Sequence, residues 1–368
     1  MAIDSMKNVI GILLTTICVI SGCKASSSTI EFEASFSMSS FEECVSEITV
    51  IPLEDDNEHM LGDDLNLLLS EDSFILSDGI TSRIFRYSRA GRFLNTIGAK
   101  GRGPAEYIEF NGVQIVDDKV NVYVPHGDVL TYLVDGTFVS RLTEENLGAK
   151  VWQVDEGFFT YSGYGSVSGY KAAYIREGKT ISFMPSDEKV LQLSPRTNIF
   201  CEVPNGVVFI DSYTNDLLIF SNGAISNYLT IDFGKYALPK EFYEFDDAYA
   251  AAELMLSRTF ALIQTYQESC NKAFLDVMVM APDNTSRHYG ISEDGQWRWF
   301  YLGKQDDIFA GAPSVLKDDV LYFVLDPAKL STFPNSLKQK VSNPEVLDTL
   351  MPDSNYFIAS VKLYNIMK

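Results

Sequence analysis

Short apolar segments alternate with turn residues along most of the chain, and this pattern predicts β-strands rather than helices. Residues 73–107 show it clearly. The apolar run 74–76 ends at Asp78-Gly79, residues 83–87 alternate between apolar and polar, and a turn at Ala90-Gly91 leads into 93–97. Short strands joined by glycine hairpins are typical of propeller blades.

The same hairpin recurs along the chain. An aromatic or branched residue, a few turn residues, a glycine and a second short strand repeat, with the glycines at Gly91, Gly136, Gly178, Gly223 and Gly295. Their spacings are 45, 42, 45 and 72 residues, the last being one period plus 27. Tight hairpins need a positive φ, which glycine adopts without steric cost. The constant period predicts a repeat architecture.

Each repeat contains one strongly apolar strand, and there are six: 74–76, 120–124, 158–161, 207–210, 275–280 and 321–325. We therefore predict an all-β fold, a six-bladed β-propeller over residues 45–368. A β-sandwich would explain alternating strands but not their constant spacing. Two β-like segments, 30–38 and 48–53, precede the repeats, and 355–363 ends them. We expect the two ends of the chain to share one blade, which leaves the ring without a free edge.

The excess of 27 residues lies at about 239–270 and has a different pattern. Tyr249, Ala252, Leu256, Phe260 and Ile263 recur every three or four residues after Asp246-Asp247. This spacing predicts one amphipathic helical insertion with acidic residues at its start. We expect its apolar stripe to be buried on the propeller. A lid or partner-docking element beside the central opening is the alternative.

The last repeat differs from the others because prolines are dense in it, at Pro327, Pro334, Pro344 and Pro352. Proline cannot donate a backbone hydrogen bond to a sheet. We therefore expect a long loop here, and no hairpin glycine follows at the expected place.

The N-terminus has the pattern of an export signal. Lys7 precedes the apolar run 9–20, which is too short to span a bilayer but suits a signal peptide over residues 1–22. The sequence Ile20-Ser21-Gly22-Cys23 resembles the bacterial lipobox. That resemblance implies acylation of Cys23, with residues 23–44 as lipid anchor and tether, the serine-rich stretch 26–29 being flexible. It predicts an outer-membrane lipoprotein, periplasmic or surface-exposed. A plain secretory signal is the alternative.

The composition excludes one class of partner. The 368 residues carry a net charge of −21, which repels phosphate backbones, so we expect no nucleic-acid binding. Without Cys18 of the predicted signal and the acylated Cys23, three cysteines remain, Cys44, Cys201 and Cys270, and this odd number excludes a complete disulfide framework. We expect buried free thiols.

A family resemblance rests on the end of the first repeat. Gly91-Arg92-Phe93-Leu94, Ile97-Gly98 and Gly101-Arg102-Gly103-Pro104-Ala105-Glu106-Tyr107 are similar to a pattern of the NHL-related six-bladed propeller lipoproteins of Bacteroidetes. The resemblance implies a six-bladed ring on a lipoprotein. From the residues themselves, the glycines allow a tight crossing between blades where Glu106 caps backbone amides. A ligand bound at Arg102, Glu106 and Tyr107 is the alternative.

One set of carboxylates follows from the repeat. Asp78, Asp211 and Asp326 each end an apolar strand. If these strands line the central channel, the three carboxylates form a ring suited to Ca²⁺ or to sugar hydroxyl groups. Alternatively, each aspartate caps its own turn. The three histidines, His59, His126 and His288, lie outside zinc motifs.

Two functions are consistent with these features. The first is a lipid-anchored binding or scaffold protein of the cell envelope, with a glycan or protein partner. The second is a metal-dependent hydrolase or lyase of the lactonase kind, with a divalent cation in the channel, since NHL-like propellers include such enzymes. We favour binding, because the acidic groups are scattered and only three of six blades supply an aspartate.

Overall fold

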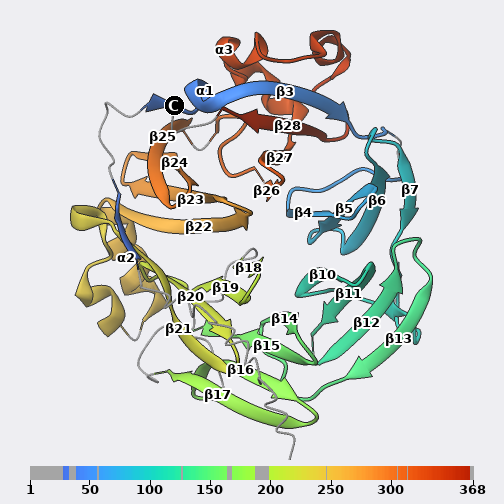
Figure 1. Ribbon diagram of the computed structural model, residues 1–368, viewed down its shortest axis with the longest axis vertical. Coiled ribbons are helices and arrows are strands. Elements are labelled where there is room, and N and C mark those ends of the chain that lie inside the picture. Colours follow the sequence, from blue (N-terminus) through green and yellow to red (C-terminus); the bar gives the residue numbers. More distant parts are fainter. Residues whose placement is uncertain are drawn as a thin grey trace, which may run out of the picture.

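The fold is a ring of six antiparallel sheets around a central axis (Figure 1). The computed structural model describes residues 28–32, 39–55, 58–125, 127–163, 168–186, 199–245, 247–304, 306–312 and 314–364. The predicted signal peptide, Cys23 and His126 lie outside these residues. The ring confirms the predicted six-bladed β-propeller.

Each blade has four strands that follow one another from the axis outward. Blade 1 contains β4 (Leu65–Leu69), β5 (Ser73–Asp78), β6 (Arg83–Ser88) and β7 (Phe93–Thr96); blade 2 contains β10 (Gly112–Val116), β11 (Lys119–Val124), β12 (Asp128–Leu133) and β13 (Phe138–Thr143); blade 3 contains β14 (Lys150–Val154), β15 (Gly157–Tyr161), β16 (Tyr170–Arg176) and β17 (Lys179–Pro185). Blade 4 contains β18 (Phe200–Val203), β19 (Gly206–Ile210), β20 (Asp216–Ser221) and β21 (Ala224–Asp232); blade 5 contains β22 (Phe260–Ser269), β23 (Lys272–Ala281), β24 (Asn284–Glu293) and β25 (Gln296–Lys304).

Blade 6 closes the ring by joining the two ends of the chain. It contains β26 (Ser314–Lys317), β27 (Val320–Leu325), β28 (Phe357–Leu363) and, as its outer strand, β3 (Val45–Pro52) from the N-terminal side. The β3–β28 register runs from Pro52 opposite Phe357 to Val45 opposite Leu363. This confirms the predicted shared blade, and it explains the missing sixth hairpin glycine, because the fourth strand does not follow β28.

The N-terminal segment before β3 follows a different course from the predicted one. β1 (Ser28–Glu31) pairs in parallel with β21 of blade 4, and β2 (Ser39–Ser40) pairs in parallel with β25 of blade 5. The short helix α1 (Phe41–Cys44) then leads into β3. Of the predicted segment 30–38, residues 30 and 31 therefore pair with blade 4 and not with the last blade, while 33–38 lie outside the described residues, and Ser28 and Thr29 are strand residues rather than flexible tether. The outer edges of β21 and β25 offer free backbone groups, which these strands satisfy.

Aromatic packing holds this N-terminal segment in place. The ring of Phe32 is buried and makes edge contacts with Phe233, at 5.3 Å between centroids, and with Trp299, at 4.8 Å. The Trp299 indole N–H donates to the carbonyl oxygen of Glu31 at 2.8 Å. Phe32 thereby fills the seam between blades 4 and 5.

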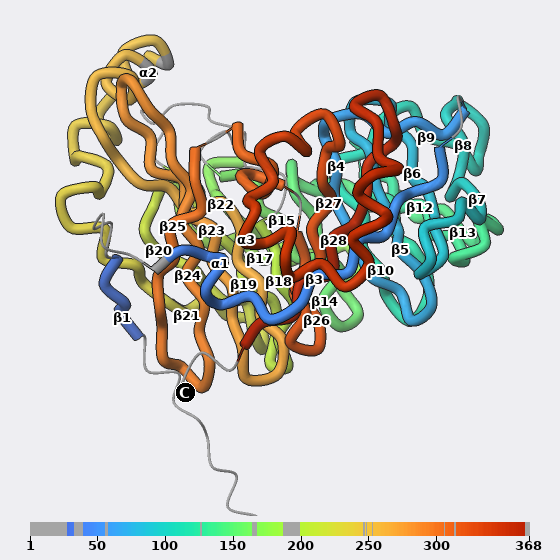
Figure 2. The backbone as a smooth tube through the Cα atoms, turned by 90° about the horizontal axis from the view of Figure 1, so that it is seen from above, coloured from blue at the N-terminus to red at the C-terminus, as the bar shows by residue number. Residues whose placement is uncertain are grey.

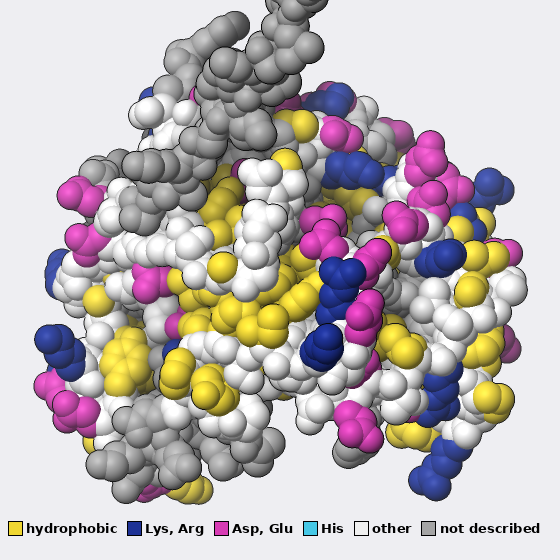
Figure 3. All heavy atoms as spheres, turned by 60° about the horizontal axis from the view of Figure 1, so that its bottom comes forward, with side chains coloured by type: hydrophobic (Ala, Val, Ile, Leu, Met, Phe, Trp, Pro, Cys, Tyr) yellow, Lys and Arg dark blue, Asp and Glu magenta, His cyan; other side chains and the backbone are white. Residues whose placement is uncertain are grey.

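Stacked aromatic rings also fill the seam between blades 3 and 4. Phe159 of β15 stacks on Phe220 of β20 with 4.6 Å between centroids. Tyr174, Phe183 and Ile225 pack against this core while only partly buried. Figure 3 brings the bottom of the Figure 1 view, where blade 3 lies, toward the reader. Hydrophobic side chains gather near the middle of this view.

The two faces of the ring differ because connections alternate between them. The face that we call the hairpin face carries the turns from first to second and from third to fourth strands. All five predicted hairpin glycines lie there with φ between 68° and 88°. At the opposite face, the loop face, the outer strands end and the first strands begin, and this face carries β8 (Ala99–Lys100) and β9 (Glu106–Tyr107) between blades 1 and 2. Figure 2 shows β8, β9 and α2 (Ala248–Ser257) on the same side of the ring.

The helical insertion was predicted in the right place but with the wrong extent and the wrong face. It consists of η2 (Gly234–Tyr236), η3 (Lys240–Glu244) and α2, which Asp247 caps by accepting from the Tyr249 N–H at 2.9 Å. Phe260 and Ile263 belong to β22 instead. Tyr249 and Leu256 are 87% and 68% exposed, whereas Ala251 and Phe242 are buried. The inward side of the helix, with Ala251, Leu254 and Met255, lies in one apolar cluster with Phe242 of η3 and Tyr213 of blade 4.

The proline-rich segment of blade 6 is the predicted long loop. It joins β27 to β28 over the loop face through η4 (Pro327–Thr332), α3 (Asn335–Lys338) and η5 (Pro344–Thr349). Among the described residues, no helix is long and apolar enough to cross a membrane.

We expect the stability of the ring to fall between neutral and mildly acidic pH because of His288. Its side chain lies against Phe32 and is 6% exposed, and burial lowers its pKa from 6.5 to about 4. The unfolded chain binds this proton at higher pH than the folded chain, so protonation favours unfolding below about pH 6.5. Between pH 7 and pH 4.5, the wild type should lose about 2 kcal/mol more unfolding free energy than His288→Gln. Urea titrations at both pH values measure this difference; equal losses in the two proteins would contradict it.

Candidate functional site

A cavity of about 630 Å³ lies on the ring axis and is the candidate site. The first strand of every blade contributes to its wall. The first strands β4, β10, β14, β18, β22 and β26 each place at least one side chain in the wall. In that order, examples are Asn66, Ile115, Trp152, Glu202, Gln267 and Leu316. The site therefore exists only when the ring is complete.

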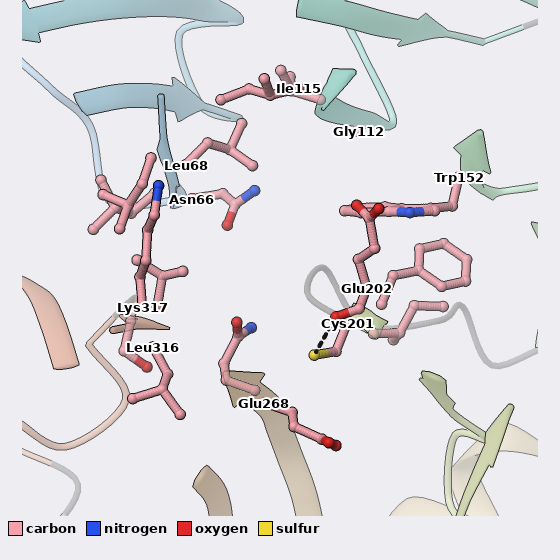
Figure 4. A pocket seen from close by; sticks show the side chains of 18 of the residues that line it. Asn66, Leu68, Gly112, Ile115, Trp152, Cys201, Glu202, Glu268, Leu316 and Lys317 are labelled. Atoms are coloured by element: carbon pink, nitrogen blue, oxygen red, sulfur yellow. Dashed lines mark hydrogen bonds between the residues drawn. The ribbon is translucent and has the colours of Figure 1, made fainter. Parts of the chain in front are cut away.

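An aromatic ring and a carboxylate stand side by side in this wall. Trp152 and Glu202 come from the adjacent strands β14 and β18, and Figure 4 shows the Glu202 carboxylate beside the indole, with Asn66 across the cavity. Phe200 supports the indole at 5.6 Å between ring centroids. Partial loss of water raises the pKa of Glu202, and the negative charge of Asp117 adds to this effect.

Two lysines balance the acidic groups of the cavity. Lys150 begins β14 and Lys317 ends β26, so they stand at opposite ends of the wall. Burial lowers the pKa of Lys150, while the charge of Asp64 acts in the opposite direction. The Lys150 ammonium also donates to the carbonyl oxygen of Asn111 at 3.4 Å. The cavity thus offers an aromatic surface, amide groups and charges of both signs.

Glu268 is a wall residue whose carboxylate is used elsewhere. Its Oε2 accepts hydrogen bonds from the hydroxyl groups of Tyr228 in blade 4 and Tyr266 in blade 5, each at 2.5 Å. Burial, followed by the interaction with Glu268, raises the pKa of both phenols. Figure 4 shows Glu268 directed away from the cavity. This carboxylate therefore ties two blades together and leaves Glu202 as the acidic group beside Trp152.

The three predicted channel aspartates lie one strand further out than expected. Asp78, Asp211 and Asp326 end or follow β5, β19 and β27, which are second strands, whereas first strands line the axis. The strongly apolar strands are the second ones because they are covered on both sides. Among the described residues, no three His, Cys, Asp or Glu side chains are grouped so that they could hold a metal ion.

Two of these aspartates cap local turns, as the alternative interpretation holds. Asp78 is fully buried and accepts from the backbone N–H groups of Gly62 at 2.7 Å and Ile80 at 2.9 Å, and from the Thr81 hydroxyl at 2.7 Å. Asp326 accepts from the N–H of Ala328 at 2.8 Å and caps η4. Both carboxylates organise connections on the loop face.

Asp211 joins two blades. It lies in blade 4 and accepts from the Tyr161 hydroxyl at 2.7 Å and from the Lys171 ammonium at 3.1 and 3.2 Å, both in blade 3. All three side chains are buried. The Asp211–Lys171 ion pair therefore joins blades 3 and 4 across their seam, and we call it the Asp211–Lys171 latch.

The motif at the end of blade 1 builds the crossing to blade 2. Glu106 accepts from the Gly103 N–H at 2.8 Å, which confirms the predicted cap, and the Tyr107 hydroxyl donates to the carbonyl of Ile97 at 2.8 Å. A Cβ at Gly101 would lie 2.0 Å from Glu106 Oε2. Arg102 is exposed. Two of the three residues of the predicted ligand site thus have structural contacts.

The three cysteines in the part of the chain that the structure describes are free, as expected from their number. Cys44 and Cys201 are buried, and burial raises the pKa of each thiol to about 12. Cys270 differs from the expectation because it is exposed, at a tight turn of the hairpin face with φ of 54°.

Comparison of the sequence with known families gives one match. A profile described as a domain of unknown function, DUF4934, covers residues 27–362. The chain belongs to the DUF4934 family. No curated protein matches the sequence of this DUF4934 chain.

Two solved structures share the fold of the DUF4934 chain. A Bacteroides fragilis protein described as exported aligns with a TM-score of 0.74 and 16% identity, over 92% of this chain and 100% of that one. A DUF4221 family member from Bacteroides vulgatus aligns with a TM-score of 0.53 and 11% identity, over 87% and 99% of the respective chains. At these identities the likeness shows the propeller fold alone.

Removing the ammonium of the Asp211–Lys171 latch should destabilise the DUF4934 protein. Lys171→Met leaves a buried carboxylate with one hydroxyl donor, and we expect a loss of about 3 kcal/mol in unfolding free energy. Adding Asp211→Asn should restore part of this loss. Chemical denaturation measures both changes.

Lys362→Met is the matched control. Its partner Glu47 is 2.8 Å away, but both side chains are well exposed, so the loss should stay below about 1 kcal/mol. Similar losses of unfolding free energy in Lys171→Met and Lys362→Met would show that the buried Asp211–Lys171 pair stabilises the protein no more than an exposed ion pair.

Proposed function

We propose that this protein is a lipid-anchored binding protein of the cell envelope that takes a saccharide into its central channel. The observation that carries the proposal is the axial cavity of about 630 Å³, walled by all six blades, with Trp152 beside Glu202. Ligand sites for small molecules have volumes of about 300–1,000 Å³ and combine apolar walls with a few convergent polar groups.

The wall chemistry suits a sugar. An indole face packs against the C–H groups of a pyranose ring, while carboxylate and amide side chains bond its hydroxyl groups. Trp152 supplies the indole, and Glu202, Asn66 and Gln267 supply the polar atoms. The mixed charges of Lys150, Lys317 and Glu202 leave no strong field of one sign in the cavity, which favours a neutral or weakly charged ligand.

Two observations support the cellular location. The apolar run 9–20 followed by Cys23 has the pattern of a lipoprotein signal, and a structural relative is described as exported. The blade 1 motif Gly101–Tyr107 is similar to a pattern of NHL-related lipoproteins of Bacteroidetes. This similarity agrees with the lipoprotein signal and with export. We infer an outer-membrane lipoprotein.

The course of β1 supports one orientation on such a membrane. β21 leaves the hairpin at Gly223 and runs toward the loop face, and β1 runs parallel to it. The chain therefore reaches the ring from the hairpin side. A lipid on Cys23 would turn the hairpin face toward the membrane and the loop face, with α2, away from it.

Saccharide binding should depend on Trp152 and Glu202. We expect Trp152→Ala to weaken binding at least about tenfold, since buried aromatic contacts dominate such sites. The measurement is calorimetric titration with the tightest ligand from a panel of neutral and acidic oligosaccharides. Tyr249→Ala is the control, because Tyr249 is exposed on α2 and away from the cavity. A failure of every saccharide to bind, or equal affinity for Trp152→Ala, would refute the proposal.

Binding should also fall in acid. The pKa of Glu202 is raised, so its carboxylate loses charge at higher pH than an ordinary glutamate. If the carboxylate accepts sugar hydroxyls, affinity declines as pH falls through that raised pKa. Glu202→Gln should bind more weakly at pH 7 and lose this pH dependence. A wild-type affinity that is constant from pH 7 to pH 4.5 would show that Glu202 does not take part.

Acylation at Cys23 is tested separately. In a bacterial host that exports the protein, radiolabelled palmitate should label the wild type and the control Cys18→Ala, but not Cys23→Ala. Cell fractionation should show Cys23→Ala released from the membrane fraction. Equal labelling of all three proteins would place the lipid elsewhere.

A further inference from the structure

A buried polar network fills the seam between blades 2 and 3, in contrast to the aromatic packing between blades 3 and 4. Gln114 of β10 and Asn121 and Tyr123 of β11 are 2%, 4% and 1% exposed, and each bonds to Gln153 of β14. β10 and β14 lie side by side in the ring (Figure 1). A buried polar network in which the groups are bonded fixes local geometry, because a displacement leaves a group without its partner.

The side-chain amide of Gln114 bonds to the backbone of Gln153 as a neighbouring strand would. Its Oε1 accepts from the Gln153 N–H at 2.8 Å, and its Nε2 donates to the Gln153 carbonyl at 3.2 Å. Gln153 stands opposite Phe158 of β15, and the two bonds to Gln114 lie on the other edge of β14. Gln114 thus satisfies the inner edge of this strand. It is not one of the described residues that line the axial cavity.

Two further side chains hold the same place. The Tyr123 hydroxyl donates to Gln114 Oε1 and accepts from the Gln153 N–H at 3.0 Å. Burial raises the pKa of the Tyr123 phenol, so the hydroxyl keeps its proton and remains a donor. The Asn121 amide donates to the side-chain oxygen of Gln153 at 2.7 Å. Gln153 is therefore held by blade 2 through both its backbone and its side chain.

Trp152 is the residue directly before Gln153. The N–H that Gln114 holds belongs to the planar peptide unit that joins these two residues and begins at the Trp152 Cα. Side chains alternate along a strand, so the indole lies on the opposite side of the sheet from the Gln153 side chain. There Phe200 of blade 4 contacts it, at 5.6 Å between ring centroids. The part of β14 that carries the indole is therefore held from both neighbouring blades.

We propose that Gln114 is a positioning residue for the saccharide site, which sets the direction of the Trp152 indole by holding the peptide unit between Trp152 and Gln153. The inference rests on the proposed function. An indole that is already ordered in the wall costs the ligand no ordering entropy on binding. Without the Gln114 amide, the peptide unit loses a partner and the indole gains freedom, so affinity falls although every wall residue is still present.

The same pair of bonds occurs at a second place and supplies a matched control. The Asn343 side-chain oxygen accepts from the Val50 N–H at 3.0 Å, and its amide nitrogen donates to the Val50 carbonyl at 2.8 Å. Val50 lies in β3, the outer strand of blade 6, whereas first strands wall the cavity. Loss of the Asn343 amide therefore removes the same kind of contact without touching the strand of Trp152.

The test compares Gln114→Met with Asn343→Leu, both of which replace an amide by an apolar side chain of similar size. Calorimetric titration uses the tightest saccharide of the panel described above. The anisotropy of Trp152 emission, isolated by comparison with the Trp152→Phe form of each variant, reports the freedom of the indole without any ligand. Circular dichroism verifies folding. Tyr123→Phe is a milder variant, which removes the hydroxyl but keeps the Gln114 amide.

We expect Gln114→Met to weaken saccharide binding at least about fivefold and to lower the anisotropy of Trp152, as for residues coupled by direct contact. Asn343→Leu should change neither quantity. Tyr123→Phe should act in the same direction as Gln114→Met with a smaller effect, and it decides the question if Gln114→Met does not fold.

Unchanged affinity in a folded Gln114→Met, or equal effects of Gln114→Met and Asn343→Leu, would overturn the positioning role while the saccharide site stands. Weaker binding with unchanged Trp152 anisotropy would also overturn it, because the effect would then not pass through the indole. If no saccharide binds to the wild type, the proposed function itself fails and the positioning role fails with it.

Discussion

Pairing between β3 and β28 is the constraint on which the rest of the ring depends. The two strands come from opposite ends of the chain, and they pair from Pro52 opposite Phe357 to Val45 opposite Leu363, with one register shift between Lys362 and Leu363. Without β3, blade 6 would have three strands and an exposed edge, and nothing would hold it at the position that closes the ring. The axial cavity needs all six first strands, so closure is also the condition for the candidate site. Such non-local pairing brings a high entropic cost early in folding.

Once the ring is closed, the alternating direction of the strands places the tight hairpins on one face and the longer connections on the other. The hairpin face carries tight turns, which need positive φ at residues such as Gly91 and Asn222. The loop face carries the inter-blade crossings, the helical insertion and the proline-rich segment. Carboxylates at the ends of second strands organise this face: Asp78 and Asp326 by capping turns, Asp211 by joining two blades. Their similar positions thus reflect a shared structural task with different partners.

The sequence predicted the fold well because the hairpin glycines and the apolar second strands carry a periodic signal. It predicted the site less well for a physical reason. Second strands such as β5 are buried on both faces and read as strong apolar runs, whereas first strands such as β18 are short, with Glu202 exposed between buried Cys201 and Val203. The channel was therefore assigned to the wrong strand of each blade, and Trp152 was overlooked. Reading one strand upstream of each apolar run would have found it.

The helical stripe failed for another reason, since helical spacing does not say which face has a partner. Tyr249 and Leu256 point to solvent because the opposite side of α2, with Ala251 and Leu254, lies in an apolar cluster with Phe242 of η3, a neighbour that the periodicity could not reveal. The pairing of 355–363 with the N-terminal strand, by contrast, was predictable. The strand at one end of a ring of repeats needs a partner, and the strand at the other end supplies it.

The electrostatics of the cavity contrast with those of the whole molecule. The chain carries a net charge of −21, yet Lys150 and Lys317 line the cavity. Two tyrosine hydroxyls turn the Glu268 carboxylate into the seam between blades 4 and 5, which leaves Glu202 as the acid beside Trp152. An anionic ligand would meet repulsion from the acidic surface before it reached the lysines. A neutral ligand with hydroxyl groups would meet no such barrier and would find both donors and acceptors inside, and for this reason the charge distribution favours the proposed saccharide over an anionic ligand.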